Sequence, residues 1–351
     1  MSNKITMSTD WHFGKSNGRF DNIILNGIIE QCNYAKNNNI KVMINLGDTL
    51  DVKQSITTST MNYLAKAFQL INDTFDKVYV LVGNHDMSKK TYNNDGHNLH
   101  IFSGYNNIEV IDSPKIISIF DSDFYFMPYF PNDYLKNHIF EEARFMCAHI
   151  EVQGFMLNQF VKAEDGLNMQ AITNIYDNVF LGHFHKRQSR GNVSYIGNMC
   201  RFFYGENDEE RGWTILDVDT NKYEFIEYHH PKMYKFKLST LMSLDEDLNK
   251  IFEPGDNLKL VIDKQLKYSE LEEFKTKLIL DYKINDLVLD DQFYAFDIDE
   301  IDDEDETDDN VADLDPSYME YLLTEMTKII TDDNAVEALE YLREKSKDYQ
   351  E

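Results

Sequence analysis

The stretch Asn178-Val-Phe-Leu-Gly-His-Phe-His185 joins an apolar run to a glycine and two histidines that are separated by one residue. Such an apolar run is typical of a short buried strand. Alternate side chains of an extended segment point to the same side, so the spacing of His183 and His185 directs both imidazoles to one place. Imidazole is the commonest metal ligand among side chains. The stretch therefore predicts a metal site at the end of a buried strand.

Four motifs upstream repeat this arrangement, with metal-ligating residue types directly after an apolar run. They are Asp10-Trp-His12, Gly47-Asp48-Thr-Leu-Asp51, Gly83-Asn84-His85-Asp86 and Ala148-His149-Ile-Glu151. Each motif alone is a weak signal, because single histidines are more often structural and Gly-Asp turns are common. Their ordered combination brings carboxylate, amide and imidazole groups from separate strand ends to one pocket. This is what a two-metal phosphoesterase requires.

The residue types suit the hydrolysis of a phosphodiester. That reaction needs an activated water, neutralised phosphoryl oxygens and help for the leaving oxygen, and two divalent ions roughly 3.5–4 Å apart supply the first two. Asp48 is the candidate bridging carboxylate, Asn84 offers a neutral oxygen ligand, and Asp10 and His12 show the same alternate spacing as the histidine pair. A set of oxygen and nitrogen ligands without thiolate favours manganese, iron or zinc over magnesium alone.

Two further residues are candidates for proton transfer. A carboxylate beside an imidazole selects its tautomer and raises its pKa, so Asp51 and His85 form a candidate pair in which His85 donates a proton to the leaving oxygen or stabilises it. Asp86 and Glu151 are expected to orient the ligands from behind.

The pattern of apolar residues predicts a layered α/β/β/α sandwich over residues 1–230. Strand-like runs at 5–8, 40–46 and 78–82 alternate with helix-like stretches at 20–36 and 57–75, which indicates a largely parallel sheet with helices on its faces. From about residue 105 closely spaced strands follow, and these predict a second sheet packed on the first. They are expected at 108–111, 116–120, 124–129, 145–149, 179–181, 193–196, 213–217 and 223–228.

Three smaller parts are expected after Pro231. A strand–helix–strand pattern at 258–262, 269–282 and 287–289 predicts a small α/β capping domain over 231–296. Residues 297–316 form an acidic linker, with a mimic of nucleic acid over the active site as the alternative interpretation. Two amphipathic stripes in 317–351 predict helices that dock a partner, and the alternative is that they fold back on the main body.

Charge and cysteine content limit the cell compartment and the partners that we expect for the protein. Cys32, Cys147 and Cys200 are odd in number and far apart, which is typical of a reduced protein. We find no signal segment and no apolar run of about 18 residues, so we expect a cytoplasmic protein. The net charge of the 351 residues is −28, which disfavours nucleic acid as a partner.

The distribution of charge weakens that objection. Residues 297–315 hold twelve acids and no base, so without them the net charge is −16. Basic residues next to the motifs are candidate DNA contacts on a locally positive rim. They are Lys15, Arg19, Lys53, Lys89, Lys90, Lys186 and Arg187.

The five motifs, which span residues 10–185, are similar to those of the calcineurin-like metallophosphoesterases: Asp-x-His, Gly-Asp-x-x-Asp, Gly-Asn-His-Asp/Glu, a lone His, and Gly-His-x-His. Within that family the chain resembles the SbcD and meiotic-recombination nuclease branch, especially the nuclease subunits of recombination endonucleases from T-even-type phages. Further stretches carry this resemblance. They are Asp10–Gly14, Gly47–Val52, His149–Gly154, Tyr195–Gly197 and Phe203–Trp213. The protein Ser/Thr phosphatases have an arginine where Val52 stands and a glutamate where Asp86 stands.

The resemblance implies a site, an activity and partners. One ion would be held by Asp10, His12, Asp48 and His185, and the other by Asp48, Asn84, His149 and His183. His85 would lie at the scissile phosphate. The implied metal is manganese, and the implied activity is a double-strand DNA exonuclease that also acts as an endonuclease on single strands, in recombination, repair and replication. The implied partners are a second copy of the chain and an SMC-like ATPase of the SbcC type, bound through residues 317–345.

Two other functions remain open from the sequence. The first is another activity of the same superfamily, such as a phosphomonoesterase or a cyclic-nucleotide phosphodiesterase, for which the capping domain and the docking helices would be superfluous. The second is a scaffold that binds DNA or the ATPase without cleaving. A complete set of ligand residues disfavours the scaffold.

Overall fold

The computed structural model describes residues 3–51, 55–87, 96–102, 104–157, 161–204, 210–244 and 248–291. The expected acidic linker, 297–316, and the expected docking helices, 317–351, lie outside the described residues. Within the described part, every helix is too short or too polar to cross a membrane.

The first large sheet has six strands in the order β12-β11-β1-β2-β3-β4. Strands β1 to β4 are parallel, whereas β11 runs antiparallel to both of its neighbours, β1 and β12. The bounds are β1 Lys4–Ser8, β2 Val42–Asn45, β3 Lys77–Leu81, β4 Ile108–Ile111, β11 Gly212–Asp217 and β12 Lys222–Glu227. The parallel order matters for function, because it brings the carboxyl ends of β1, β2 and β3 to the same edge.

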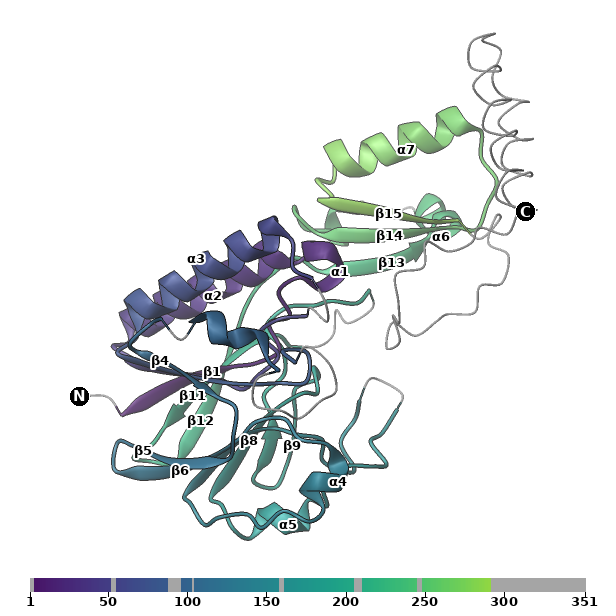
Figure 1. The fold of residues 1–351 in the computed structure, drawn as a ribbon. Helices are drawn as coiled ribbons and strands as arrows, with labels where there is room; N and C mark the ends of the chain where they lie inside the picture. The colour runs from purple at the N-terminus through teal and green to yellow at the C-terminus, as the bar shows by residue number, and fades with distance from the viewer. Residues whose placement is uncertain are drawn as a thin grey trace, which may run out of the picture. The chain divides into compact units, whose positions relative to one another are not determined.

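Two long helices, α2 (Asp21–Asn37) and α3 (Thr58–Thr74), lie side by side over one face of this sheet (Figure 1). An apolar stripe on α2, made of Ile24, Ile28, Cys32 and Ala35, is buried in the core beneath them. Helix α3 begins after Thr57, whose side chain accepts a hydrogen bond from the backbone N–H of Thr60. Both predicted helices are confirmed to within two residues at each end.

The second large sheet has the order β5-β6-β7-β8-β10-β9. Its inner face packs on the first sheet through a shared core that includes Ile5, Ile44, Phe126 and Phe180. Its outer face is covered by a separate apolar cluster beneath short helices. The bounds are β5 Lys115–Ile119, β6 Ser122–Met127, β7 Phe145–His149, β8 Asn178–Gly182, β9 Gln188–Arg190, β10 Val193–Tyr195, α4 Asn132–Leu135 and α5 Gln170–Thr173. The short helices α1 (Lys15–Gly18) and η1 (Asn98–Phe102) lie in connections of the first sheet. The layered α/β/β/α sandwich is confirmed.

The sequence assigned three strands to the wrong sheet. The strands expected at 108–111, 213–217 and 223–228 exist, but as β4, β11 and β12 they complete the first sheet. The alternation of apolar residues indicates a strand and its buried face, but it carries no information about which distant strand will pair with it. Close spacing along the chain was therefore a poor guide to sheet membership.

Residues after Pro231 form a small parallel sheet in the order β13-β14-β15 with its own apolar cluster, which includes Leu258, Leu260 and Leu278. The bounds are β13 Met233–Lys237, α6 Leu238–Ser243, η2 Leu248–Lys250, β14 Asn257–Ile262, α7 Tyr268–Leu280 and β15 Asp286–Asp291. The sequence missed β13 and α6, because a five-residue strand leading straight into a six-residue helix shows too few repeats of either period. The division of the chain at Pro231 stays a prediction.

Candidate metal centre

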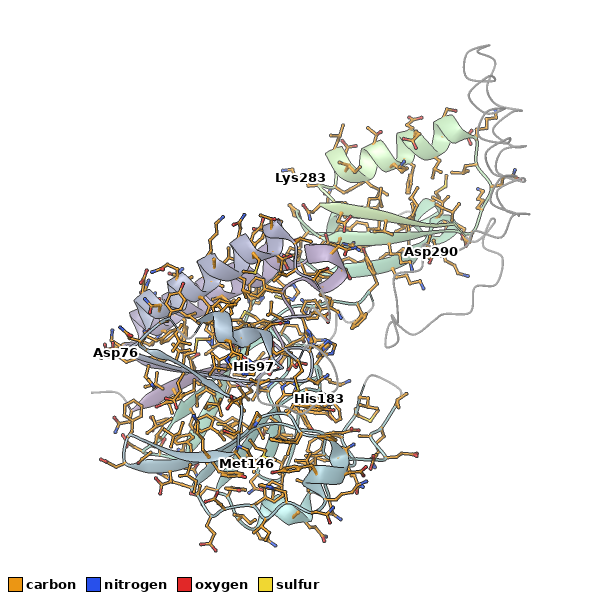
Figure 2. The ribbon with its side chains drawn as sticks, viewed as in Figure 1. Asp76, His97, Met146, His183, Lys283 and Asp290 are labelled. Atoms are coloured by element: carbon orange, nitrogen blue, oxygen red, sulfur yellow. The ribbon has the colours of Figure 1, made fainter. Side chains whose placement is uncertain are left out.

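The predicted ligands come from the ends of five strands. Asp10, Asp48 and Asn84 follow β1, β2 and β3 by two or three residues, and His149 is the last residue of β7. His183, which Figure 2 labels, lies just beyond β8. The loop after β1 also runs beside the loop after β2: the backbone N–H of Asp10 donates to Gly47 O (2.9 Å). Side chains from both large sheets therefore meet at one edge of the sandwich.

The side chains converge for a different reason from the one that the sequence indicated. Asp10, His12 and His183 lie outside the strands and have positive φ angles of 51°, 53° and 95°, and Asp48 has a φ of 52°. The sequence predicted an extended backbone with alternate side chains for Asp10–His12 and for His183–His185, and that prediction is wrong for both motifs. Left-handed residues other than glycine cost roughly 1–2 kcal/mol each. The sharp turns that result direct the ligands inward from strand ends that do not themselves point at one spot.

A glycine at the end of β8 lets the two sheets approach each other here. A Cβ atom on Gly182 would lie 2.2 Å from Thr9 Oγ1 and 2.7 Å from Leu46 O. Any larger residue would hold the loop of His183 and His185 away from the loops after β1 and β2. The glycine before the histidine pair is therefore part of the geometry of the site.

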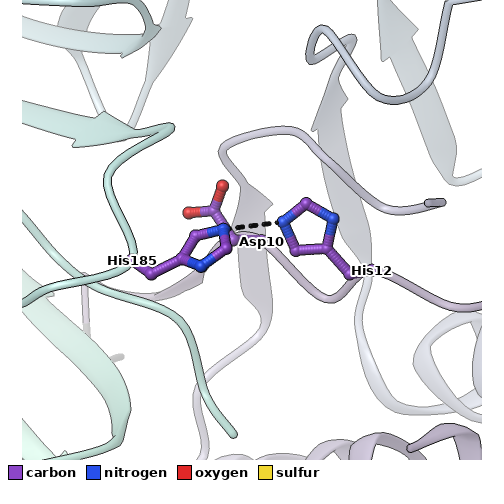
Figure 3. Close-up of side chains that lie close together, drawn as sticks. All are labelled: Asp10, His12 and His185. Atoms are coloured by element: carbon purple, nitrogen blue, oxygen red, sulfur yellow. Dashed lines mark hydrogen bonds between the residues drawn. The ribbon is translucent and has the colours of Figure 1, made fainter. Parts of the chain in front are cut away.

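One group of candidate ligands comprises Asp10, His12 and His185, whose ligand atoms lie within 4.8 Å of one another (Figure 3). Nε2 of His12 is 2.9 Å from Nε2 of His185. The backbone N–H of His183 donates to the Asp10 carboxylate (3.1 Å). Within the described residues Nδ1 of His12 has no hydrogen-bond partner, and it lies 3.9 Å from Oδ2 of Asp51.

A second group comprises Asp48, His149 and His183, with Asn84 between the two imidazoles. The Oδ1 atom of Asn84 is 3.0 Å from Nε2 of His149 and 3.0 Å from Nδ1 of His183. Nδ1 of His149 lies 2.7 Å from Leu46 O and donates to it, and Nε2 lies 3.3 Å from Oδ2 of Asp48. Burial would lower the pKa of His149, but the charge of Asp48 and the hydrogen bond to it raise that pKa to about 9.

Asp48 is a member of the second group, and its Oδ2 lies 3.8 Å from Nε2 of His12 in the first. It also forms a possible ligand set with His12 and His85, and its Oδ1 accepts a hydrogen bond from the backbone N–H of His85 (2.9 Å). Its side chain is buried, and a Cβ atom on Gly83 would lie only 2.1 Å from Oδ1. This central carboxylate is placed as a bridge between two ions would be.

The predicted pair of Asp51 and His85 is in contact. Nδ1 of His85 lies 2.7 Å from Oδ1 of Asp51, and Nζ of Lys15 lies 3.1 Å from Oδ2 of the same carboxylate. Burial would lower the pKa of His85, but the charge of Asp48 and the hydrogen bond to Asp51 outweigh it and raise that pKa. The raised pKa favours the protonated imidazole, which is the form that can donate a proton.

The electrostatics of the site fit bound cations. Burial and the nearby Asp48 carboxylate raise the pKa of Asp10 to about 7 although His149 opposes them, so the charged form is unfavourable without a compensating cation. Burial lowers the pKa of His12 and of His183 to about 3, which keeps both imidazoles neutral and able to bind a metal. Buried carboxylate, amide and imidazole groups without thiolate suit divalent transition metals.

The two acidic residues expected behind the ligands have different positions. Asp86 is buried and accepts hydrogen bonds from the backbone N–H groups of Leu50 (2.8 Å) and Gly83 (2.9 Å), so it ties the second motif to the third. Glu151 instead accepts a hydrogen bond from Asn132 on α4 (2.9 Å). It therefore links the end of β7 to the helix outside the centre.

The candidate DNA contacts are dispersed. Lys15 lies at the centre beside Asp51, while Arg19 donates to the hydroxyl of Tyr204 (2.5 Å). Lys186 is half-buried, and the guanidinium of Arg187 lies 4.0 Å from the centre of the Phe225 ring. Lys53, Lys89 and Lys90 lie outside the described residues.

Sequence reasoning missed two residues beside the ligands. The ring centre of Tyr129 is 6.2 Å from that of His149 and 5.9 Å from that of His183. The buried Arg211 donates to His185 O (2.6 Å) and to Asn198 Oδ1. Tyr129 follows a strand in the same way as the ligands do, so its position after β6 was a usable signal. Arg211 lies in the stretch Phe203–Trp213 that carries the family resemblance, but that stretch did not indicate its contacts, because they are long-range.

Comparisons with known proteins agree with this architecture. Exonuclease subunit 1 of Enterobacteria phage T4 is 29% identical over 244 residues, which cover 67% of this chain and 71% of that protein. The family profile described as calcineurin-like phosphoesterase matches residues 4–232, which include every strand of both large sheets and every candidate ligand. The match extends over more than half of the chain, which therefore belongs to the calcineurin-like phosphoesterase family.

Proposed function

We propose that this phosphoesterase is a two-metal DNA nuclease, a double-strand exonuclease that also cuts single strands. The observation that carries the proposal is the position of Asp48, whose Oδ2 lies 3.8 Å from Nε2 of His12 and 3.3 Å from Nε2 of His149. A pair of ions around one carboxylate suits the cleavage of a phosphodiester. The similarity to exonuclease subunit 1 of phage T4 supports DNA as the substrate.

Asp10, His12, Asp48 and His185 would hold one ion, and Asp48, Asn84, His149 and His183 the other, with manganese the metal that we propose. When bound, the ions supply an activated water and neutralise charge on the phosphoryl group.

Residues of the chain supply the rest of the chemistry. His85 is partly exposed next to the ligand cluster and bonded to Asp51, so it can approach the scissile phosphate and donate its proton to the leaving oxygen. Asp51 orients the imidazole, and Lys15 neutralises the outer oxygen of that carboxylate. The carbonyl of Leu46 selects the tautomer of His149 that directs Nε2 into the site.

The proposal extends to partners. The similar phage protein is named a subunit, and an SMC-like ATPase of the SbcC type, bound through residues 317–345, is the partner that we propose. We also propose that the chain forms a homodimer, that it lies in the cytoplasm, and that it acts in recombination, repair and replication. These assignments rest on the resemblance of the sequence and on the amphipathic pattern of residues 317–345.

Another activity of the superfamily is the rival function. Purified protein with manganese should degrade labelled duplex DNA and single-stranded DNA much faster than an aryl phosphomonoester or a cyclic nucleotide. Hydrolysis of the small substrates without any cleavage of DNA would assign the chain to the rival class. Binding of DNA with no hydrolysis of any substrate would make it a scaffold.

The role of His85 has a separate test. His85→Ala should lower the rate of DNA cleavage roughly a hundredfold or more while metal binding stays unchanged, because the imidazole donates a proton and Asp48 and Asn84 remain. His229→Ala is the matched control, since that imidazole is 88% exposed and lies outside the site. Equal activity of the two variants would remove His85 from the mechanism.

A further inference from the structure

Three consecutive aromatic residues, Phe202, Phe203 and Tyr204, begin at the edge of the metal centre. The ring of Phe202 contacts the imidazoles of His12 and His185 edge-on, with ring centres 5.7 Å and 6.0 Å apart. The next residue along the chain is Phe203, so its backbone is attached directly to a residue that touches the first group of ligands. An aromatic side chain therefore follows immediately after the edge of the candidate site.

Packing of the core accounts for two of these three rings. Phe202 is buried, and Tyr204 packs against the same apolar cluster, which includes residues of α2 and α3. Phe203 is different, because it is 44% exposed and belongs to none of the apolar clusters in the described part of the chain. Its one ring contact among the described residues is with Lys15. A flat face of the Phe203 ring is therefore available to a ligand.

Lys15 links the exposed ring to the residues that we propose for proton transfer. Its ammonium lies 5.5 Å from the centre of the Phe203 ring and 5.8 Å from that of Phe202. The same nitrogen lies 3.1 Å from Oδ2 of Asp51, whose Oδ1 contacts His85. A single lysine side chain thus spans the space between the ring and the catalytic pair. A nucleotide with its phosphate at the metal centre would have its base within reach of Phe203.

The charges around these rings disfavour recognition by phosphate contacts alone. Lys15 is paired with Asp51, and Arg19, which donates to the Tyr204 hydroxyl, is paired with Asp286. The whole chain carries a net charge of −28. Stacking of a base on an aromatic ring needs no positive charge, and every base has a face that can stack. A stacking residue would therefore supply affinity for nucleotides that the acidic surface does not.

We propose that Phe203 is a specificity-determining residue, which stacks on the base of a nucleotide next to the scissile phosphodiester. This inference rests on the proposed nuclease function and adds to it the recognition of a base by the side chain beside Lys15. The site would then prefer a phosphodiester that is flanked by a base to one that is not.

The test removes the base and the ring separately. An oligonucleotide that carries one abasic residue is cleaved with manganese, and the rates at the phosphodiesters on its two sides are compared with those at the same positions of the unmodified oligonucleotide. Wild-type protein should be about tenfold slower at one of the two positions when the base is missing. Phe203→Leu should cleave the unmodified oligonucleotide about tenfold more slowly and show no further loss at the abasic residue. Phe203→Tyr, which keeps the ring, should behave as the wild type does.

Two controls separate stacking from a loss of structure. Phe203→Leu should bind manganese as the wild type does, because Phe203 offers no ligand atom. Tyr134→Leu removes a ring of similar exposure, 43%, that already stacks with Phe130 and His138 on or near α4, and it should keep the wild-type dependence on the base.

The inference is overturned if wild-type protein cleaves equally well with and without the base on either side. It is also overturned if Phe203→Leu loses as much rate at the abasic residue as the wild type does. Wild-type protein that hydrolyses a small phosphodiester such as bis(p-nitrophenyl) phosphate but cleaves no oligonucleotide would instead overturn the proposed function, so the two failures are distinguishable.

Discussion

The two groups of ligands at the metal centre are held in different ways. In the second group, His149 is bonded to the carbonyl of Leu46, and both His149 and His183 lie 3.0 Å from Oδ1 of Asn84. In the first group, His12 and His185 contact each other. Nδ1 of His12 has no hydrogen-bond partner in the part of the chain that the structure describes.

The difference indicates unequal affinities. An imidazole whose outer nitrogen is bonded to a carbonyl has a set tautomer and orientation, so less entropy is lost when a metal binds. When an ion binds to the first group, the tautomer of His12 must still be selected. The Nε2 atoms of His12 and His185, which are 2.9 Å apart, must also separate. We therefore expect the second group to bind its ion more tightly, and Asp48 to couple the two sites.

The largest effect is expected from Asp48, the carboxylate that lies between His12 of the first group and His149 of the second. Asp48→Asn removes a charge from the middle of the cluster, and we expect DNA cleavage to fall by roughly a thousandfold, or about 4 kcal/mol. A calorimetric titration with manganese should show that both metal-binding steps are weakened. Asp73→Asn is the matched control, because that carboxylate is on the surface of α3. Loss of only one binding step would show that Asp48 does not bridge.

An intermediate effect separates the two groups. His183→Ala should weaken the tighter of two manganese-binding steps by about a hundredfold, whereas His185→Ala should weaken the looser step by a similar factor. Calorimetric or electron paramagnetic resonance titration measures both steps in each variant. If both substitutions weaken the same step, or if His185→Ala weakens the tighter one, the order of affinities that we infer is wrong.

The smallest effect concerns the pH profile. Because the hydrogen bond and the charge of Asp51 raise the pKa of His85, and because the protonated form donates the proton, activity should fall as pH rises through that pKa. Asp51→Asn removes that charge and lowers the pKa, so the alkaline fall should begin at a lower pH. Rates of DNA cleavage across neutral and alkaline pH at saturating manganese measure this shift. An unmoved alkaline limb would mean that another group controls it.

Several parts of the site were predictable because their signals are local. Asp10, Asp48, Asn84, His149 and His183 were found as ligating residue types directly after apolar runs, and the structure brings them together. The contact between Asp51 and His85 was expected from the motifs and is confirmed. Their catalytic and metal-binding roles stay predictions.

Other parts depend on contacts between distant residues. The backbone of His12 and His183 is left-handed, not extended, because the loops after β1, β2 and β8 bond and pack against one another. Arg211 bonds to the carbonyl of His185, 26 residues before it. Tyr129 was overlooked because only residues that can bind metal were sought at the strand ends.

By itself the sequence determined which segments become the main strands and helices, which residue types follow them and what chemistry those types allow, because periodicity and strand-end motifs are properties of short stretches. Only the tertiary structure decided which strands share a sheet, how positive φ angles direct the ligands inward, and why one ligand group is better held than the other. Those features depend on the close approach of groups such as Gly182 and Thr9, which lie far apart in the chain.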